Sequence, residues 1–135
     1  MVDNLSKEQR KKTMSLVRGK DTKPEMAVRK LVHSIGYRYR LHRKNLPGCP
    51  DLVFSGRHKV IFVHGCFWHG HDCHAGLNRP SSNKNYWTEK LERNIQRDAE
   101  NLRQFKEMDW GALVIWECEI KNSSVMVKRI HRFLK

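Results

Sequence analysis

The residues best suited to chemistry lie together in one stretch, Val60-Ile-Phe-Val-His-Gly-Cys-Phe-Trp-His-Gly-His-Asp-Cys73. The stretch begins as a short apolar run of the kind that predicts a buried strand. Two thiols, Cys66 and Cys73, and two imidazoles, His69 and His71, follow the run. Because thiolates and imidazoles are the usual protein ligands of zinc, this density predicts metal-binding chemistry at the end of a strand.

Four of the thiols and imidazoles predict a structural site for one Zn²⁺ ion. Cys66, His71 and Cys73 would supply three ligands from one loop. Cys118, just after a strand predicted at 112–116, would supply the fourth, and a ligand distant in sequence is normal in a closed tetrahedral site. The ion would clamp the loop to the edge of the sheet.

The spacing alone leaves two of these ligands open. His69 and His74 compete with His71, and Cys49 competes with Cys118. The alternative to a metal site is a set of reduced cysteines in a core, but three soft ligands so close in sequence favour zinc.

Pro50-Asp51 marks a second predicted site. Strands predicted at 51–54 and 59–63 form a hairpin, and their antiparallel pairing would bring Asp51 close to His64. A carboxylate there can hold Mg²⁺ for phosphodiester hydrolysis, and the unperturbed pKa of a histidine such as His69 suits a general base. By spacing alone, the favoured interpretation of Asp51 is a turn residue or the first residue of a strand. A zinc ligand is an equally good interpretation of His69.

The rest of the sequence predicts the elements that must position these residues. Helices are predicted at 6–17, 22–35, 86–108 and 123–134, and strands at 37–42, 51–54, 59–63 and 112–116. This order favours an α/β fold, with a mixed β-sheet flanked by helices, in a single domain over residues 1–135.

Within these elements, three features have a purely structural interpretation. Thr22-Lys-Pro-Glu25 has the form of a capping box, which would account for Glu25. The strand at 112–116 is apolar throughout and is expected to be fully buried. One stripe of the longest helix is expected to face the core: Trp87, Leu91, Ile95, Ala99, Leu102 and Phe105.

The chain of 135 residues has a formal net charge of +13, concentrated toward its N-terminus. Residues 1–45 hold 13 Lys and Arg against 4 Asp and Glu, and residues 1–20 are expected to form a basic helical arm. This excess predicts a polyanionic partner, DNA first, with an anionic membrane surface as the weaker alternative. A bilayer-spanning run and a secretory signal are not found, so we expect a cytoplasmic protein whose four cysteines bind metal rather than form disulfides.

Aromatic residues beside the ligand cluster predict contact with DNA bases. Phe67 and Trp68 lie among glycines and potential metal ligands, and Trp87 lies at the start of the longest helix. Such side chains can wedge between base pairs and unstack them. Trp87 can equally be a core residue, which its place in the helical stripe favours.

Several segments together resemble the very short patch repair (Vsr) family of DNA mismatch endonucleases. They are Asp21-Thr22 with Glu25, Leu46-Pro-Gly-Cys-Pro-Asp51, the Val60–Cys73 stretch, Asn94-Ile-Gln-Arg-Asp98 and Val114-Ile-Trp-Glu-Cys118. They occur in order over nearly the whole chain, and the part from His64 to Cys73 is highly specific.

The resemblance implies a restriction-endonuclease-like fold and a Mg²⁺-dependent endonuclease that initiates very short patch repair. Members of this family nick DNA on the 5′ side of the thymine in a T:G mismatch, where a 5-methylcytosine has deaminated. The implied substrate is double-stranded DNA with that mismatch, in the bacterial cytoplasm at the nucleoid. Other mismatch-repair proteins are implied partners, and a monomer is expected for an enzyme that cuts one strand.

The resemblance also implies roles for individual residues. Asp51 would bind Mg²⁺ together with the backbone carbonyl of Val63, and two such ions are expected. His69 would activate water, and His64 would assist at the phosphate. Accessory catalytic roles fall to Glu25 and Asp98. The zinc ligands would be Cys66, His71, Cys73 and Cys118.

The implied DNA-binding residues come from three parts of the chain. The intercalating wedge would consist of Phe67, Trp68 and Trp87, with Met14 entering from the other groove. Further DNA contacts are expected from the basic arm and the longest helix: Lys11, Lys12, Arg18 and Asn94.

Two features depart from related nucleases. The general nuclease fold carries an E-x-K motif on the strand after the aspartate, where this chain has Phe62-Val63-His64. The Vsr family shares that loss. Position 63 is commonly threonine in relatives, so the chain keeps the backbone carbonyl there but lacks a hydroxyl.

Two other classes of protein fit part of the sequence. A zinc-stabilised DNA-binding module without catalysis would explain the charge and the cysteines. It has no need for a metal-accessible carboxylate at Asp51, opposite His64 and His69. A hydrolase with a catalytic zinc needs an open coordination position, and a fourth ligand at Cys118 argues against it.

Overall fold

The computed structural model describes residues 22–66, 69, 71, 73 and 84–135. Its elements are α2 (Lys23–Ser34), β1 (Arg40–Leu41), β2 (Leu52–Phe54), β3 (Lys59–His64), α4 (Lys84–Glu107), β4 (Gly111–Trp116) and α5 (Ser123–Leu134), with short 3₁₀ turns η1 (Ser55–Arg57) and η2 (Glu117–Glu119). From the second predicted helix onward, the predicted order of elements is confirmed. The helix predicted at 6–17 and the arm at 1–20 lie outside the described residues.

The four strands form one mixed sheet in the order β1-β2-β3-β4. β1 pairs with β2 and β2 pairs with β3 in antiparallel orientation. β3 pairs with β4 in parallel, from Lys59 opposite Gly111 to His64 opposite Trp116. Two parallel neighbours need a long connection, and α4 lies in the one between β3 and β4. The mixed sheet and the hairpin of β2 and β3 are thus confirmed.

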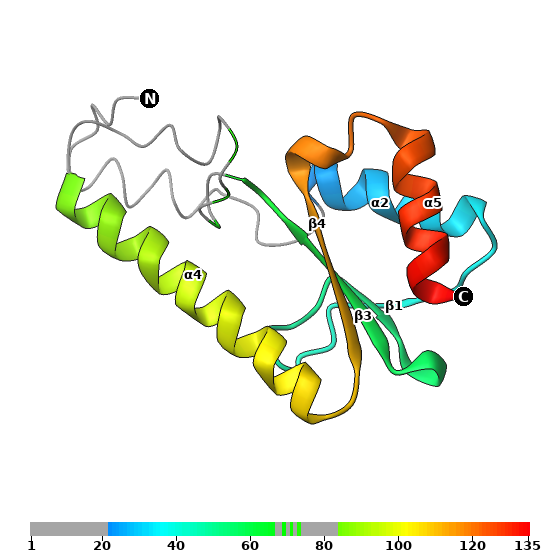
Figure 1. The fold of residues 1–135 in the computed structure, drawn as a ribbon, viewed down its shortest axis with the longest axis horizontal. Coiled ribbons are helices and arrows are strands. Elements are labelled where there is room, and N and C mark those ends of the chain that lie inside the picture. Colours follow the sequence, from blue (N-terminus) through cyan, green and yellow to red (C-terminus); the bar gives the residue numbers. More distant parts are fainter. Residues whose placement is uncertain (1–21, 67–68, 70, 72, 74–83) are drawn as a thin grey trace.

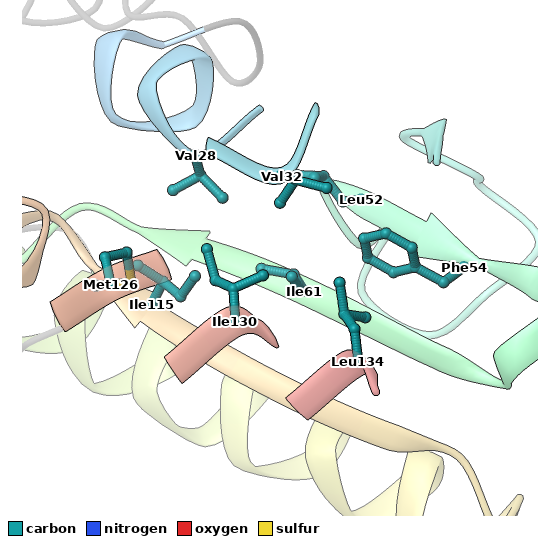
Figure 2. Close-up of a cluster of buried hydrophobic side chains, with 9 residues drawn as sticks. All are labelled: Val28, Val32, Leu52, Phe54, Ile61, Ile115, Met126, Ile130 and Leu134. Carbon is teal, nitrogen blue, oxygen red and sulfur yellow. The ribbon is translucent and has the colours of Figure 1, made fainter. Parts of the chain in front are cut away.

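Helices cover both faces of this sheet (Figure 1): α4 lies on one face, and α2 and α5 lie on the other. The larger core forms between the sheet and the pair α2 and α5. Figure 2 shows its buried side chains: Val28, Val32, Leu52, Phe54, Ile61, Ile115, Met126, Ile130 and Leu134. The smaller core faces α4 and contains Val53, Val60, Phe62 and Phe105.

The two cores follow from the alternation of side chains along each strand. In β3, Ile61 packs toward α2 and α5, whereas Val60 and Phe62 pack toward α4. The next residue in the second series is His64, which β3 therefore presents on the α4 side, at the end of the strand.

Three sequence expectations differ from the structure. The strand predicted at 37–42 is reduced to Arg40–Leu41, because the backbone leaves the extended region at His42, where φ is +46°. The strand β4 has only Ile115 fully buried, because it lies at the edge of the sheet. Ile95 of the expected core stripe is 39% exposed, because it packs against neither core, although Leu91 and Phe105 on the same stripe are 0% exposed.

The described helices include none that is long and apolar enough to cross a bilayer.

The packing of the larger core predicts the effect of truncating its central residue. Ile61 is 0% exposed on the central strand β3, so Ile61→Ala should lower the free energy of unfolding by about 2–5 kcal/mol. Val125 on α5 is 57% exposed, and Val125→Ala is the control, with an expected change below about 0.5 kcal/mol. Urea denaturation followed by circular dichroism measures both. Equal losses would contradict the assignment of Ile61 to the core.

Candidate active site and metal-binding cluster

One group of potential ligands joins the end of β3 to α4. His69 Nδ1 lies 2.5 Å from Asp98 Oδ2, so the ring N–H donates to the carboxylate. The His64 ring stacks on His69 with 3.8 Å between centroids and 3° between planes, and His64 Nε2 lies 4.0 Å from Asp98 Oδ1. The structure therefore brings together three residues that the sequence analysis placed in the catalytic centre.

The environment of His64 favours its neutral form. Burial, together with the neighbouring His69 ring, lowers the pKa of His64 to about 4, although the Asp98 carboxylate opposes the shift. At neutral pH the ring is therefore uncharged. Its Nδ1 atom is buried and has no hydrogen-bond partner among the described residues.

A second group lies on the α2 side of the same strand end. The backbone N–H of Val63 donates to Asp51 Oδ2 over 2.7 Å, which links the carboxylate just before β2 to the C-terminal end of β3. The hairpin thus places Asp51 beside the residue that precedes His64, as the antiparallel pairing predicts. Glu25, which is 2% exposed, comes from α2 to the same position.

Glu25 is more than a capping residue. The Thr22 side chain does accept a hydrogen bond from the Glu25 backbone N–H, at 3.3 Å, as the first half of the predicted capping box requires. The Glu25 carboxylate, however, contacts the Arg29 guanidinium and His42 Nε2. Its side chain therefore contributes to a polar cluster around Asp51.

The pKa of Asp51 reflects the free-energy cost of burying two acidic side chains close together. Burial raises it from 3.8 to about 7; the N–H of Val63 opposes this shift and the Glu25 carboxylate adds to it. Two carboxylates that share a desolvated site repel each other when both are ionised. A divalent cation would relieve that repulsion, so the donor set fits a metal ion such as Mg²⁺.

His42 and Arg29 are the members of this cluster that the sequence analysis missed. His42 Nε2 lies 2.9 Å from Glu25 Oε2 and 3.9 Å from Asp51 Oδ1. The ligand atoms of Glu25, His42 and Asp51 all lie within 4.8 Å of one another. Two signals could have revealed them: the spacing of four between Glu25 and Arg29 on a helix, and a β1–β2 hairpin that sets His42 opposite Asp51.

The predicted zinc ligands also meet in space. The ligand atoms of Cys66, His71, Cys73 and Cys118 all lie within 4.8 Å of one another. Cys118 Sγ lies 3.5 Å from His71 Nδ1, and the Cys118 backbone N–H donates to Cys66 Sγ over 3.4 Å. The set is Cys₃His, one of the usual compositions of structural zinc sites.

The cluster contains one of the two cysteines that spacing left open as the fourth ligand. Cys118 lies in the cluster, whereas Cys49 is exposed and belongs to no such group within the described residues. The competing His74 lies outside the described residues. Burial raises the pKa of Cys66 to about 12, and the neighbouring thiols Cys73 and Cys118 add to the shift, while the N–H of Cys118 opposes it. Thiols so crowded need a cation to ionise together, which again fits a bound metal.

Trp116, at the end of β4, lies between the two groups of histidines. His71 stacks on its ring with 4.1 Å between centroids and 11° between planes. His64 meets the same ring edge-on at 5.1 Å, and His69 does so at 6.3 Å. From the sequence, this tryptophan is expected only as part of a buried strand and of a family-like segment, without a role beside the histidines.

The predicted DNA-binding residues are only partly described. Trp87 is 7% exposed and stacks edge-on with Tyr86 at 5.1 Å between centroids. This burial is typical of a core residue, and the wedge role of Trp87 stays a prediction. Asn94 accepts a hydrogen bond from Arg97 over 3.2 Å. The remaining predicted residues lie outside the described part of the chain: Lys11, Lys12, Met14, Arg18, Phe67 and Trp68.

Comparison with known proteins gives consistent relatives. The model of the family described as DNA mismatch endonuclease Vsr matches residues 2–75. The chain is 48% identical over 134 residues to the type II nicking enzyme V.XorIIP of Xanthomonas oryzae, covering 99% of this chain and 98% of that protein. It is 38% identical over 135 residues to the type II nicking enzyme V.NmeAIP of Neisseria meningitidis, covering 100% of this chain and 96% of that protein.

The DNA mismatch endonuclease Vsr of Escherichia coli is 35% identical over 121 residues, covering 90% of this chain and 77% of that protein. The family match spans more than half of the chain, and these relatives align over nearly all of it. The match also includes the residues that build the Asp51 cluster and supply three of the four soft ligands. The chain therefore belongs to the Vsr family of DNA mismatch endonucleases.

Proposed function

We propose that this protein nicks one strand of double-stranded DNA on the 5′ side of the thymine in a T:G mismatch, with Mg²⁺ as its catalytic ion. The family membership supports a DNA endonuclease. The Mg²⁺-dependent cleavage is supported by one observation: the Asp51 cluster and the histidine pair meet at the same end of β3. Asp51 is bonded to Val63, and the next residue of β3, His64, stacks on the His69 that Asp98 holds.

In this proposal His69 is the base that takes a proton from the attacking water. Asp98 engages Nδ1, which leaves Nε2 as the ring nitrogen that can accept the proton. The carboxylate fixes the tautomer and stabilises the imidazolium that forms. His69 is 27% exposed, enough for water to reach it, whereas Asp98 behind it is 19% exposed.

His64 has a different role because it does not carry charge at neutral pH. A neutral imidazole can donate one hydrogen bond through its ring N–H, to a phosphate oxygen or to an ordered water. Stacked against His69, it also limits the orientations that the base can adopt. We assign to it the positioning of the scissile phosphate.

Asp51 and Glu25, with the carbonyl of Val63, would hold Mg²⁺, and two ions are proposed. When bound, Mg²⁺ polarises the scissile phosphate and lowers the pKa of coordinated water. Asp51 suits this task because Val63 fixes one carboxylate oxygen, and the other faces the cluster.

The Cys₃His cluster would hold one structural Zn²⁺ ion. Four protein ligands fill a tetrahedral site, so the cluster leaves no open position for substrate or water. This supports a structural ion over a catalytic zinc. The clamp would join the segment after β3 to η2, since Cys66 follows β3 and Cys118 lies in η2.

Recognition of the mismatch would combine charge with deformability. The net charge of +13 favours binding to the phosphate backbone. A T:G pair stacks and pairs less well than a matched pair, so a protein that unstacks DNA spends less free energy there. Phe67, Trp68, Trp87 and Met14 are the proposed intercalating residues. A monomer suffices for a single nick, and we propose the restriction-endonuclease-like fold for the α/β domain.

A zinc-stabilised DNA-binding module is the alternative from another class. The buried pair of carboxylates, with Asp51 held at a raised pKa, speaks against it. Such a cluster costs stability and gives a binding module no advantage. The neighbouring His69–Asp98 pair is likewise the arrangement of a base and its orienting acid.

The central test is a nicking assay on duplexes with a T:G or a C:G pair in randomised flanks, with Mg²⁺ or with EDTA. We expect one nick beside the mismatched thymine, with Mg²⁺ only. His69→Ala should slow nicking by about 10²–10⁴-fold while DNA binding persists. The control is His131→Ala on α5, which contacts Tyr37. Tight binding without cleavage by the wild-type protein under any divalent ion would instead support the binding module.

The structural zinc can be tested with two cysteines that differ only in their surroundings. Cys118→Ser should reduce the bound zinc from about one ion per chain to well below half and lower the melting temperature, because one of four ligands is lost. Cys49→Ser, at an exposed position, should change neither. Elemental analysis and thermal denaturation measure both. Full zinc content in Cys118→Ser would contradict the ligand assignment.

The raised pKa of Asp51 predicts a gain in stability from neutralising it. Between pH 3.8 and about 7 the folded protein holds a proton that the unfolded chain releases, so stability falls as pH rises through this range. Without added Mg²⁺, Asp51→Asn should therefore raise the melting temperature at pH 8, by about 5 °C, and much less at pH 5. Nicking should be lost.

The matched control for this substitution is Glu89→Gln, at an exposed position on α4, which should change neither property. A lower melting temperature for Asp51→Asn at pH 8 would show that the ionised carboxylate stabilises the fold, contrary to the proposed role.

A further inference from the structure

His42 is placed among the proposed metal ligands although neither composition nor spacing singles it out. Its side chain is 17% exposed, and its Nε2 atom lies 2.9 Å from Glu25 Oε2 and 3.9 Å from Asp51 Oδ1. The three residues come from three separate parts of the chain: α2, the end of β1 and the start of β2. They converge on one point.

These separations are those of ligands around one ion. Around an octahedral divalent ion with bonds of about 2.0–2.2 Å, adjacent ligand atoms lie about 3 Å apart and opposite ones about 4.3 Å. The His42–Glu25 distance matches the first value, and the His42–Asp51 distance lies between the two. Since all three ligand atoms are within 4.8 Å of one another, small side-chain rotations would complete the geometry.

The backbone directs His42 into this position. Its φ is +46°, in the left-handed region that costs free energy for a residue with a Cβ. Its backbone N–H donates to the Asp51 carbonyl over 3.4 Å, which sets the two residues side by side across the β1–β2 pair. On the other side, the Val63 N–H holds Asp51 Oδ2, so that Oδ1 faces His42.

We propose that His42 is the third side-chain ligand of the catalytic divalent ion, beside Asp51 and Glu25, and that its imidazole shifts the site's preference from Mg²⁺ toward Mn²⁺. The inference rests on the proposed function, in which Asp51 and Glu25 bind that ion. Imidazole is a softer donor than carboxylate and suits first-row transition metals, whereas Mg²⁺ prefers oxygen ligands. A site of two carboxylates and one imidazole therefore gains more for Mn²⁺ than for Mg²⁺.

Arg29 is the cation that holds Glu25 when no ion is bound. Its guanidinium and His42 Nε2 both contact Oε2 of that carboxylate. Arg29 reaches Glu25 from the next turn of α2, so it positions the carboxylate from the helix side. His42 approaches from the sheet side, where Asp51 also lies.

The test measures Mn²⁺ binding to the full chain, purified without chelators and with its zinc content determined first. The EPR signal of free Mn²⁺ gives the dissociation constant, Mg²⁺ competition gives the preference, and pulsed EPR of bound Mn²⁺ detects a directly coordinated ¹⁴N. The variant is His42→Gln, whose side chain can still form hydrogen bonds. The control is His58→Gln, since His58 is exposed and also has a positive φ, +53°.

We expect a ¹⁴N coupling in the wild-type protein and in His58→Gln, and none in His42→Gln. The dissociation constant for Mn²⁺ should rise about tenfold in His42→Gln, with a smaller rise for Mg²⁺. Bound Mn²⁺ without ¹⁴N coupling in the wild-type protein would overturn the inference, as would a coupling that persists in His42→Gln.

Asp51→Asn separates this inference from the proposed function. If Asp51→Asn abolishes Mn²⁺ binding while the wild-type protein shows no ¹⁴N coupling, the role of His42 is overturned and the nuclease site stands. If Asp51→Asn binds Mn²⁺ as the wild-type protein does, the ion does not lie at this site and both are overturned.

Discussion

The position of β3 is the constraint on which the rest of the structure depends. It is the central partner in the sheet, antiparallel to β2 and parallel to β4, with helices on both faces. Its end supplies three adjacent groups to three different clusters: the Val63 N–H to Asp51, the His64 ring to His69, and, just beyond, Cys66 to the thiol cluster. A shift of one residue in the β2–β3 register would turn each of these groups to the wrong face.

The larger core gives this strand end its rigidity. Ile61 packs among side chains from α2 and α5, only two residues before Val63. The same helix α2 that buries Val28 and Val32 also carries Glu25 to Asp51. Packing and site geometry are therefore coupled, because a helix that moved away from the core would take one carboxylate with it.

Burying ionisable groups opposes folding, and the shifted pKa values of Asp51 and His64 show where this cost falls. The pKa of Asp51 is raised to about 7, and the pKa of His64 is lowered to about 4, so each side chain favours its neutral form. Desolvation is the largest cause in both cases. Sites that bind ions and phosphate commonly accept this cost, because the groups are already oriented when the ligand arrives.

Local patterns in the sequence were enough to predict the order of elements, the hairpin and the Cys₃His group. Periodicity, turn residues and ligand chemistry all act over short distances, and the single turn between β2 and β3 sets Asp51 beside Val63, the residue before His64. His42 required knowledge of a two-residue strand, β1, whose pairing with β2 sets it opposite Asp51. Such a short strand leaves almost no periodic signal.

The errors along α4 have a related cause. Its apolar stripe repeats at the helical period, and periodicity tells which side of a helix is apolar but not how far the helix stays on the sheet. Leu91 and Phe105 on this stripe are buried, whereas Ile95 packs against neither core and is exposed. Asp98 lies between Ile95 and Phe105, where α4 turns a polar residue toward His69.

His69, the proposed base, and the thiol cluster share one segment, which is why the proposed metal suits this place. His69 lies between Cys66 and His71 in sequence; its backbone N–H donates to the Gly65 carbonyl, and the His71 N–H donates to the Cys66 carbonyl. Trp116 contacts the histidines of both groups. In the proposed function, four bonds to one zinc ion would fix this segment, and a base fixed in this way would keep its angle to Asp98 when DNA binds.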